Sequence, residues 1–497
     1  MSQQPLTSQI EHIVVVMFEN RSFDNLLGGL YPQSATFDGL TGNETNPIDP
    51  YNPAAGSVQV SQGPPGIETM IMPFPDPNED FADMTRQLFG CNWASAMGAN
   101  PSITPTMDGF VWNYLTAKSL GGVAPSPADI MQYYATGADG NTPVTSALAA
   151  AYTVSDRWFA SGPVQTFANR VFNHCATPGS SLFKSAYLND LDYVFVIKLH
   201  GGVGDPSVFS TLDAALPKQT NWKIYYQDEA EMFGLPGGIL SALLVKYVRE
   251  VYDADNQSQV VPFARFATDV ANDTLPPYSF IEPRYFEAAG ERSQSNHPGN
   301  AIAPGTTANP MAISVCDGET FLAEIYTALT ANQAVFDKTL LVVIYDEHGG
   351  LYDHVPPPAA PSPFAHGAVE GFDYSRYGVR VPCLLINPYV NRADGVAFRP
   401  PSPGNPFDHT TIIKTVIQQF LPTDQWTSLT PRDANAPVLT NLIDPNNTPI
   451  PNVILPLFKC PIPPTFVGAA EQVPSSRQKL MQAFAEAGWE RGASPQK

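Results

Sequence analysis

The stretch Leu340–Tyr345 constrains the fold more than any other part of the chain. It is a short apolar run, typical of a strand buried on both faces of a parallel sheet. It ends abruptly in Asp346–Gly350, which reads Asp-Glu-His-Gly-Gly. Open α/β sheets bind ligands at the carboxyl ends of their strands, so these polar residues occupy the expected position of a site. The alternative is a turn with ordinary salt bridges, but Asp353 and His354 follow at once and favour a functional loop.

Other segments predict the elements around this strand. Ile13–Met17 is a second buried strand, and Tyr278–Glu282 and Val381–Ile386 are two more. A helix beginning near Asp317 has apolar residues at helical spacing and leads directly into the central strand, forming an αβ unit. We therefore predict an α/β fold, with a doubly wound, mostly parallel sheet flanked by helices.

The 497 residues are expected to form a single domain. Residues 30–105 are rich in Pro, Gly, Asn and Thr, and they predict a loop-rich insertion near the site with a brief helix around Asp83–Phe89. Residues 421–465 predict proline-rich wrapping over the body. Residues 475–489 predict a terminal amphipathic helix.

The net charge and the hydropathy pattern limit the classes of molecule that this chain can bind. The net charge of −21 argues against nucleic acid and against electrostatic docking on anionic membranes. It permits a small phosphate ester or a neutral phospholipid head group where a metal supplies positive charge. No apolar run approaches the roughly 18 residues of a membrane span, and residues 1–9 lack the pattern of a signal peptide. We expect a soluble chain without stable membrane insertion, and leave export and oligomeric state open.

The spacing of the cysteines predicts neither a metal site nor a disulfide pairing. The five cysteines are scattered and include no CxxC pair, so no zinc site follows from them. One or two disulfides are compatible with this number, but their pairing cannot be deduced.

Oxygen ligands gather at two predicted strand ends. Glu19 and Asn20 follow the first strand, while Asp346 and Glu347 follow the central one. Carboxylate and amide oxygens suit a hard divalent cation, and we expect one such ion of undetermined identity here. The alternative for Glu19 and Asn20 is ordinary capping and hydrogen bonding.

Thr166 follows a Gly-Pro turn and precedes a helix that extends to His174. The free N–H groups and dipole of a helix start favour a phosphate. A hydroxyl is a weak nucleophile at neutral pH, and metal coordination is one way to ionise it. The alternative is an ordinary threonine N-cap.

Four histidines flank the acidic residues and could bind phosphate oxygens or protonate a leaving group: His297, His348, His354 and His409. The alternative for any one of them is an unremarkable surface residue.

Taken in chain order, the motifs are similar to those of the phosphoesterase family. They are Glu19–Asp24, Met107–Phe110, Thr166 with Asn169 and Arg170, His297-Pro298, Asp346–Gly350 and Tyr352–Val355. That family contains non-specific phospholipases C and a branch of acid phosphatases, often soluble and exported.

The resemblance implies an alkaline-phosphatase-like fold and a metal held by Glu19, Asn20, Asp346 and Glu347. It also implies that Thr166 is both ligand and nucleophile, forming a phospho-enzyme. We expect His297 and His354 to act in catalysis, and these residues to bind substrate: His348, His409, Asn169, Arg170 and Glu79.

Two departures bear on substrate choice. Many members have a histidine in the segment Asp76–Phe81, where this chain offers Glu79, and the lead into the His-Pro pair is here Ser295-Asn296. The Asp-Glu-His-Gly-Gly motif favours the phospholipase branch. We therefore predict a metal-dependent, phospholipase C-like hydrolase of phosphodiesters such as phosphatidylcholine or phosphocholine-type esters. The alternatives are an acid phosphatase acting on monoesters and a catalytically silent phosphate- or lipid-binding protein.

Overall fold

The computed structural model describes most of the chain. The described residues are 4–66, 73, 75–96, 103–117, 124–179, 189–190, 193, 203–227, 248, 250, 254–285, 292–298, 315–364, 372–392 and 396–460. The expected helix at 475–489 and the end of the proline-rich segment, 461–465, lie outside these residues.

A central sheet organises the described residues, with seven strands in the order β6-β11-β10-β1-β9-β7-β8. Their bounds are β1 (His12–Phe18), β6 (Thr153–Val154), β7 (Trp222–Tyr226), β8 (Val260–Pro262), β9 (Tyr278–Glu282), β10 (Thr339–Tyr345) and β11 (Cys383–Ile386). β1 pairs in parallel with both β10 and β9, and the β9–β7 and β7–β8 pairs are also parallel. Only the pairs of β11, with β10 and β6, are antiparallel. The predicted mostly parallel sheet is confirmed.

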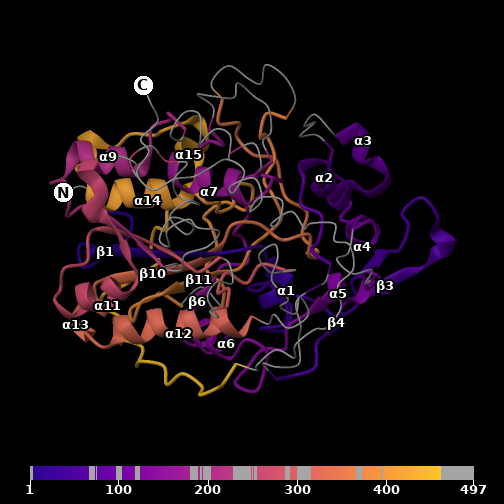
Figure 1. The fold of residues 1–497 in the computed structure, drawn as a ribbon, viewed down its shortest axis with the longest axis horizontal. Helices are drawn as coiled ribbons and strands as arrows, with labels where there is room; N and C mark the ends of the chain where they lie inside the picture. The colour runs from indigo at the N-terminus through magenta and orange to yellow at the C-terminus, as the bar shows by residue number, and fades with distance from the viewer. Residues whose placement is uncertain are drawn as a thin grey trace, which may run out of the picture.

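Helices cover both faces of this sheet (Figure 1). One layer contains α7 (Thr166–Cys175), α9 (Val208–Ala215), α14 (Thr410–Phe420) and α15 (Pro431–Asn435). The other contains α6 (Pro143–Ala151), α11 (Ala264–Ala271), α12 (Cys316–Thr330) and α13 (Gln333–Phe336). Every residue of β1 and β10 is buried, which accounts for their continuous apolar sequences. The α/β prediction is confirmed.

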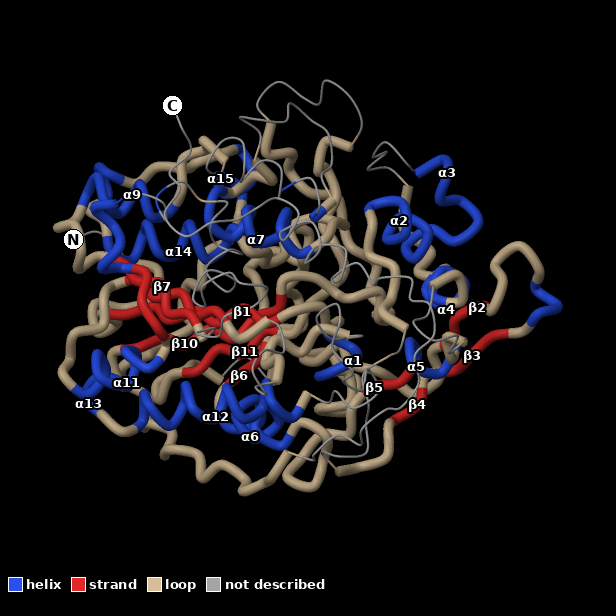
Figure 2. Tube along the Cα trace, in the orientation of Figure 1, coloured by secondary structure: helices blue, strands red, loops and turns tan. Residues whose placement is uncertain are grey.

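A second group of short elements lies beyond the carboxyl ends of the central strands, at the right of Figure 2. It comprises α1 (Phe23–Leu27), α2 (Phe81–Phe89), α3 (Trp93–Ala96), α4 (Phe110–Tyr114), α5 (Pro127–Met131), β2 (Thr45–Pro47), β3 (Ser57–Gln59), β4 (Ser61–Gln62) and β5 (Gln132–Tyr133). Short 3-10 turns occur at Pro53–Ala55, Gly90–Asn92, Ala254–Gln259 and Thr423–Gln425.

This group has its own apolar cluster, which includes Leu88, Phe89 and Phe110 and packs against Leu351 and Tyr352 after β10. The predicted loop-rich insertion is thus more ordered than its composition indicated, because its scattered apolar residues converge on the loop that carries the central motif. That packing brings the segment before α2 to the carboxyl end of β10.

The sequence did not predict three strands of the central sheet, β6, β7 and β8. β6 has two residues, and β8 lies at the end of the sheet and finishes in Pro262, which cannot donate a ladder hydrogen bond. β7 (Trp222–Tyr226) interrupts its apolar residues with Lys223. Such segments become strands only when a neighbour pairs with them.

One disulfide joins Cys316 at the start of α12 to Cys460, 144 residues further along the chain. Among the described residues Cys91, Cys175 and Cys383 are free cysteines. The bond fastens the segment after Asn435 onto the helical layer, and it resolves the pairing that the sequence left open.

We expect the double variant Cys316→Ser/Cys460→Ser to unfold at lower denaturant concentration, with a loss of about 2–5 kcal/mol, because the bond closes a long loop of the unfolded chain. Cys91→Ser, which removes an exposed free thiol, is the matched control and should leave the unfolding midpoint unchanged. Denaturant unfolding with and without reductant measures both. An unchanged midpoint in the double variant would contradict the expectation.

Candidate active site

Asn20 and Thr166 meet beyond the carboxyl end of β1. Asn20 adopts a left-handed backbone conformation with φ of 55°, which turns the chain sharply after the strand. Thr166 is the first residue of α7, and its Oγ1 donates a hydrogen bond to Asn20 Oδ1 over 3.2 Å. The N-cap of α7 is Gln165, and no side chain caps the helix there. Thr166 is therefore not the ordinary N-cap that the sequence allowed.

Arg170 lies one turn after Thr166 and is fully buried. Its Nε donates to Asp346 Oδ2 (3.1 Å), its Nη1 to Glu282 Oε2 (2.8 Å) and its Nη2 to the Met17 carbonyl oxygen (3.1 Å). These acceptors stand at the carboxyl ends of β10, β9 and β1. The guanidinium thus fixes Asp346, and its contact with substrate stays a prediction.

Asp346 and Glu347 are buried acids at the end of β10. Asp346 Oδ1 accepts hydrogen bonds from the backbone N–H groups of Asn20 (3.0 Å) and Glu347 (2.8 Å). Burial raises the pKa of Asp346 to about 6 although Arg170 opposes the shift. Burial, then the charge of Glu79, raises the pKa of Glu347 well above its usual range. Both carboxyl groups lie where solvent screens charge poorly.

Two glycines let the motif loop pass close to other backbone. Gly349 and Gly350 have φ values of 64° and 66°. A Cβ on Gly349 would lie 2.3 Å from the Asn20 carbonyl oxygen, and one on Gly350 would lie 2.7 Å from Pro77 Cβ. The Gly-Gly pair is therefore required by the approach of two other segments to this loop.

A second acidic group adjoins Asn20. Asp76, Glu79 and His297 each offer one ligand atom, and these atoms lie within 4.8 Å of one another. Asn20 Nδ2 donates to Glu79 Oε1 (2.8 Å) and lies 3.0 Å from His297 Nε2. The amide of Asn20 thus connects Thr166, through its oxygen, with this acid–histidine group, through its nitrogen.

Two predicted substrate ligands have protein partners. His409 Nε2 donates to the Asp346 carbonyl oxygen (2.8 Å), while its Nδ1 accepts from Trp158 Nε1 (3.4 Å). His348 Nε2 lies 2.7 Å from Gln87 Oε1. Burial lowers the pKa of His409 to about 4 and that of His348 to about 3. Both rings are neutral near pH 7 and hold the motif loop in place.

Asn169, a third predicted substrate ligand, supports the turn that precedes α7. Its Nδ2 donates to the Val164 carbonyl oxygen (2.7 Å), and its Oδ1 accepts from Gly162 N (3.0 Å). These bonds fix the turn that leads to Thr166. That Asn169 contacts the substrate stays a prediction.

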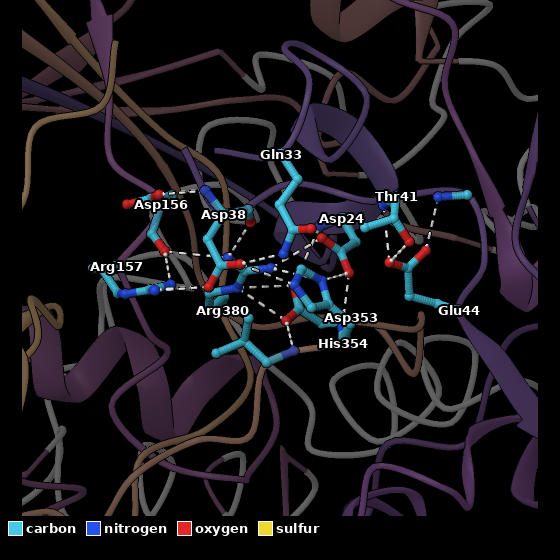
Figure 3. A network of polar contacts seen from close by, with 12 residues as sticks. Asp24, Gln33, Asp38, Thr41, Glu44, Asp156, Arg157, Asp353, His354 and Arg380 are labelled. Carbon is cyan, nitrogen blue, oxygen red and sulfur yellow. Dashed lines mark hydrogen bonds and ion pairs between the residues drawn. The ribbon is translucent and has the colours of Figure 1, made fainter. Parts of the chain in front are cut away.

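His354 lies in a different network (Figure 3). Its Nδ1 is 2.7 Å from Asp24 Oδ2, and its Nε2 is 3.3 Å from Asp38 Oδ1. Burial disfavours the charged ring, but the hydrogen bonds to Asp24 and Asp38 outweigh it and raise the pKa of His354 to about 10. Arg380 completes the network with bonds to Asp24 (2.9 Å) and Asp353 (3.0 Å). These contacts favour a fixed positive charge over proton transfer.

The sequence pattern did not identify three residues of the site. Asp190 accepts a hydrogen bond from Phe167 N (2.9 Å) at the start of α7. Asp76 lies beside His297, and Gln87 orients His348. Of these three, only Asp76 could have been found in the sequence, because it lies three residues before Glu79 and two carboxylates in one loop can bind the same ion.

The predicted metal ligands fit a divalent cation. Glu347 Oε1 is buried and has no hydrogen-bond partner in the described part of the chain. Burial raises the pKa of both Asp346 and Glu347, and a bound cation would favour their ionised forms. Within the described residues, the acid and histidine groups already at ligand spacing are Asp76–Glu79–His297 and Asp24–Asp353–His354, not the Glu19–Asp346–Glu347 set.

A hydroxyl at a helix start, bonded to Asn20 next to the acids that follow β10, suits a hydrolase of phosphoric esters with an α/β fold. It belongs to the phosphoesterase family, whose model matches residues 10–421. The resemblance found in the sequence is confirmed.

Known relatives include plant and bacterial enzymes. Non-specific phospholipase C3 of Arabidopsis thaliana is 31% identical over 83% of this chain and 70% of its own length. Phospholipase C A of Mycobacterium tuberculosis is 28% identical over 91% of this chain and 81% of its own. The lipoteichoic acid synthase LtaP of Listeria monocytogenes aligns with 60% of this chain and 70% of its own at 12% identity, with a TM-score of 0.31.

No helix in the described ranges has both the length and the apolar character needed to cross a bilayer.

The His354 network predicts a stability that declines in alkali. The pKa of this ring is raised above its usual 6.5, so its contribution is complete below about pH 6.5 and is lost as the pH rises through about 10. We expect His354→Gln to cost about 2–4 kcal/mol at pH 6, as when one partner of a buried ion pair is removed.

Denaturant unfolding from pH 6 to pH 10 measures this contribution, and the cost of His354→Gln should shrink across that range. His348→Gln replaces a ring that is neutral in the folded protein from pH 6 to pH 10. Its cost should not shrink with pH and should rise slightly, because the ring of the unfolded chain still binds a proton near pH 6. A constant cost for His354→Gln would refute a charged ring.

Proposed function

We propose that this enzyme hydrolyses phosphodiesters by attack of the Thr166 hydroxyl on phosphorus, in the manner of a phospholipase C. The contact between Thr166 Oγ1 and Asn20 Oδ1, made at the first residue of α7, is the main support for this proposal. Because Asn20 Oδ1 accepts the hydrogen bond that the hydroxyl donates, the lone pairs of Oγ1 are directed elsewhere. The N-terminal N–H groups of the helix favour a phosphate beside it.

The reaction proceeds in two displacements. Thr166 Oγ1 forms a bond to phosphorus as the bond to the leaving alkoxide breaks. We assign the proton transfer to His297 Nε2, which shares the Asn20 amide with Thr166: it takes the hydroxyl proton and passes it to the alkoxide, which leaves as an alcohol. Water then attacks the phosphothreonine, which is itself a diester. The water oxygen stays on phosphorus in the released phosphomonoester, and a water proton passes through the same nitrogen to Thr166 Oγ1 and restores the hydroxyl.

Metal dependence is part of the proposal. Glu19, Asn20, Thr166, Asp346 and Glu347 would hold one divalent cation. Such an ion would favour the ionised hydroxyl and offset the charge of the phosphoryl oxygens. Arg170 keeps Asp346 in place, and Gly349 N donates to Glu347 Oε2 over 2.7 Å, so the protein orients both acids before an ion binds.

Charge supports the choice of a diester. The site contains the carboxylates of Glu79, Asp346 and Glu347, all of them buried. Its histidines His348 and His409 are neutral near pH 7. A monoester brings nearly two negative charges and a diester only one, so repulsion disfavours the monoester at neutral pH. A cationic head group such as choline could pair with Glu79. The names of the relatives, which are phospholipases C, point the same way.

Two alternatives remain distinct. An acid phosphatase would act on monoesters at low pH, where the acids and the substrate are protonated. A silent phosphate- or lipid-binding protein would retain the fold without turnover, and the contact between Thr166 and Asn20 argues against it.

The disulfide supports a location in an oxidising compartment, because such bonds persist mainly outside the reducing cytosol. We propose export on this basis.

Thr166→Ala should reduce kcat by about a thousandfold or more, because it removes the attacking atom. The cost in stability should stay near 0.5–1.5 kcal/mol, since one hydrogen bond is lost and no cap. Thr166→Ser, which restores the hydroxyl, is the matched control and should recover much of the rate. Steady-state kinetics with bis(p-nitrophenyl) phosphate measure turnover, and more than a few per cent of activity in Thr166→Ala would mean that another group attacks.

The wild type should prefer a diester to the matched monoester at pH 7, and Glu79→His should shift the ratio of kcat/KM toward the monoester by about tenfold or more, since it removes a negative charge. Asp83→Asn removes a carboxylate from the following helix and should leave the ratio unchanged. The assay compares p-nitrophenyl phosphate with its phosphocholine ester. A tenfold preference of the wild type for the monoester would favour the acid phosphatase.

A further inference from the structure

The acid–histidine group of Asp76, Glu79 and His297 has the composition and spacing of a metal site in its own right. All three side chains are buried, at 8%, 3% and 4% exposure. His297 Nε2 lies 3.7 Å from Glu79 Oε2. Two ligands of one tetrahedral zinc ion stand roughly 3.4 Å apart, given bonds of about 2.1 Å. Glu79 is therefore close to ligand spacing from Nε2. Asp76 Oδ1 lies 3.6 Å from His297 Nδ1, so its carboxylate would have to turn toward Nε2 to complete the group around an ion.

The tautomer of His297 places a lone pair on Nε2, where Asn20 Nδ2 lies 3.0 Å away and a bound ion would take its place. Its Nδ1 lies 2.5 Å from the Pro298 carbonyl oxygen, which only accepts, so Nδ1 carries the proton. Nε2 then has the lone pair, directed toward Asn20 Nδ2 and Glu79. Metal-binding histidines usually donate their other N–H to a carbonyl or carboxylate in this way.

A third carboxylate, that of Glu347, follows β10 close to Asn20. Glu347 Oε1 is buried without a hydrogen-bond partner among the described residues. Its Oε2 accepts from Gly349 N, and Gly349 packs against the backbone of Asn20, whose amide contacts Glu79 and His297. The unpaired oxygen is thus a free ligand atom next to a group that already has three.

We propose that Asp76, Glu79 and His297 bind a second divalent cation, distinct from the one assigned to the Thr166 ligands. Two carboxylates and one imidazole suit Zn²⁺ or Mn²⁺. Three protein ligands leave a position open, as in metal sites that act on substrate. The proposal rests on the proposed function for its role but not for its existence.

Occupancy of this second site would set the choice of ester. Without the ion, Asp76 and Glu79 repel a dianion, and the lone pair of His297 Nε2 is available to relay the proton from Thr166 to the leaving group. With the ion bound, its charge would attract the additional phosphoryl oxygen of a monoester, and His297 Nε2 would be a ligand and could not relay that proton. One chain would thus act on diesters when this site is empty and accept monoesters when it is filled.

The experiment counts bound ions without substrate. The full-length protein is freed of metal and dialysed to equilibrium against Zn²⁺, and separately against Mn²⁺, and its metal content is measured. The wild type should bind two equivalents. Asp76→Asn and Glu79→Gln should each lose one, with at least a tenfold weaker second affinity, and Asp346→Asn should lose the other. Asp83→Asn, a nearby carboxylate outside the group, should retain both.

Binding of a single equivalent by the wild type, or of two that neither Asp76→Asn nor Glu79→Gln weakens, would overturn the proposal. Two variants are used so that a folding failure of one, detected by circular dichroism, leaves the other decisive. Two equivalents with the expected losses but no hydrolysis of any ester would support the second site and refute the proposed function.

A kinetic test uses the same samples. Raising Zn²⁺ from one to two equivalents should increase the ratio of monoester to diester kcat/KM about tenfold or more. That increase should disappear in Glu79→Gln, and its persistence there would count against the second site.

Discussion

A single guanidinium holds together the parts on which the site depends. Arg170 extends from α7 to the carboxyl ends of β10, β1 and β9, three adjacent strands of the sheet, and bonds to each of them. The charge is fully buried and is balanced by Asp346 and Glu282. Because the same helix begins with Thr166, the position of the hydroxyl is fixed relative to the acids of β10. A shift of any one strand would break a buried charged bond, which is costly.

The sequence predicted the core of this arrangement and little of its periphery. The buried strands were recognisable because continuous apolar runs occur where a parallel sheet is covered on both faces, as in β1 and β10. Thr166 was recognisable because a Gly-Pro turn precedes an amphipathic helix. The order of α2–α5 was not, because it depends on contacts such as those of Phe110 and Leu88 with Leu351, which no local pattern records.

The same distinction applies to the site. The motif Asp346–Gly350 follows its strand directly, so its place was predictable from strand polarity alone. The partners of the histidines were not, because each ring meets a residue distant in sequence: His348 meets Gln87, and His354 meets Asp24 and Asp38. These partners decide whether a ring is neutral or charged. Residue type and spacing therefore identified the histidines as a set but could not assign their separate roles.

The acid–histidine group and the nucleophile differ in what anchors them. Thr166 begins α7 and Asp346 follows β10, and Arg170 ties that helix to the covered sheet. Asp76 and Glu79 precede α2, in a segment anchored by a smaller apolar cluster. This segment can open alone at lower free energy, as small cooperative units do. Mutation and thermal fluctuation can thus alter the acidic side chains around Asn20 Nδ2 while the hydroxyl of Thr166 keeps its place.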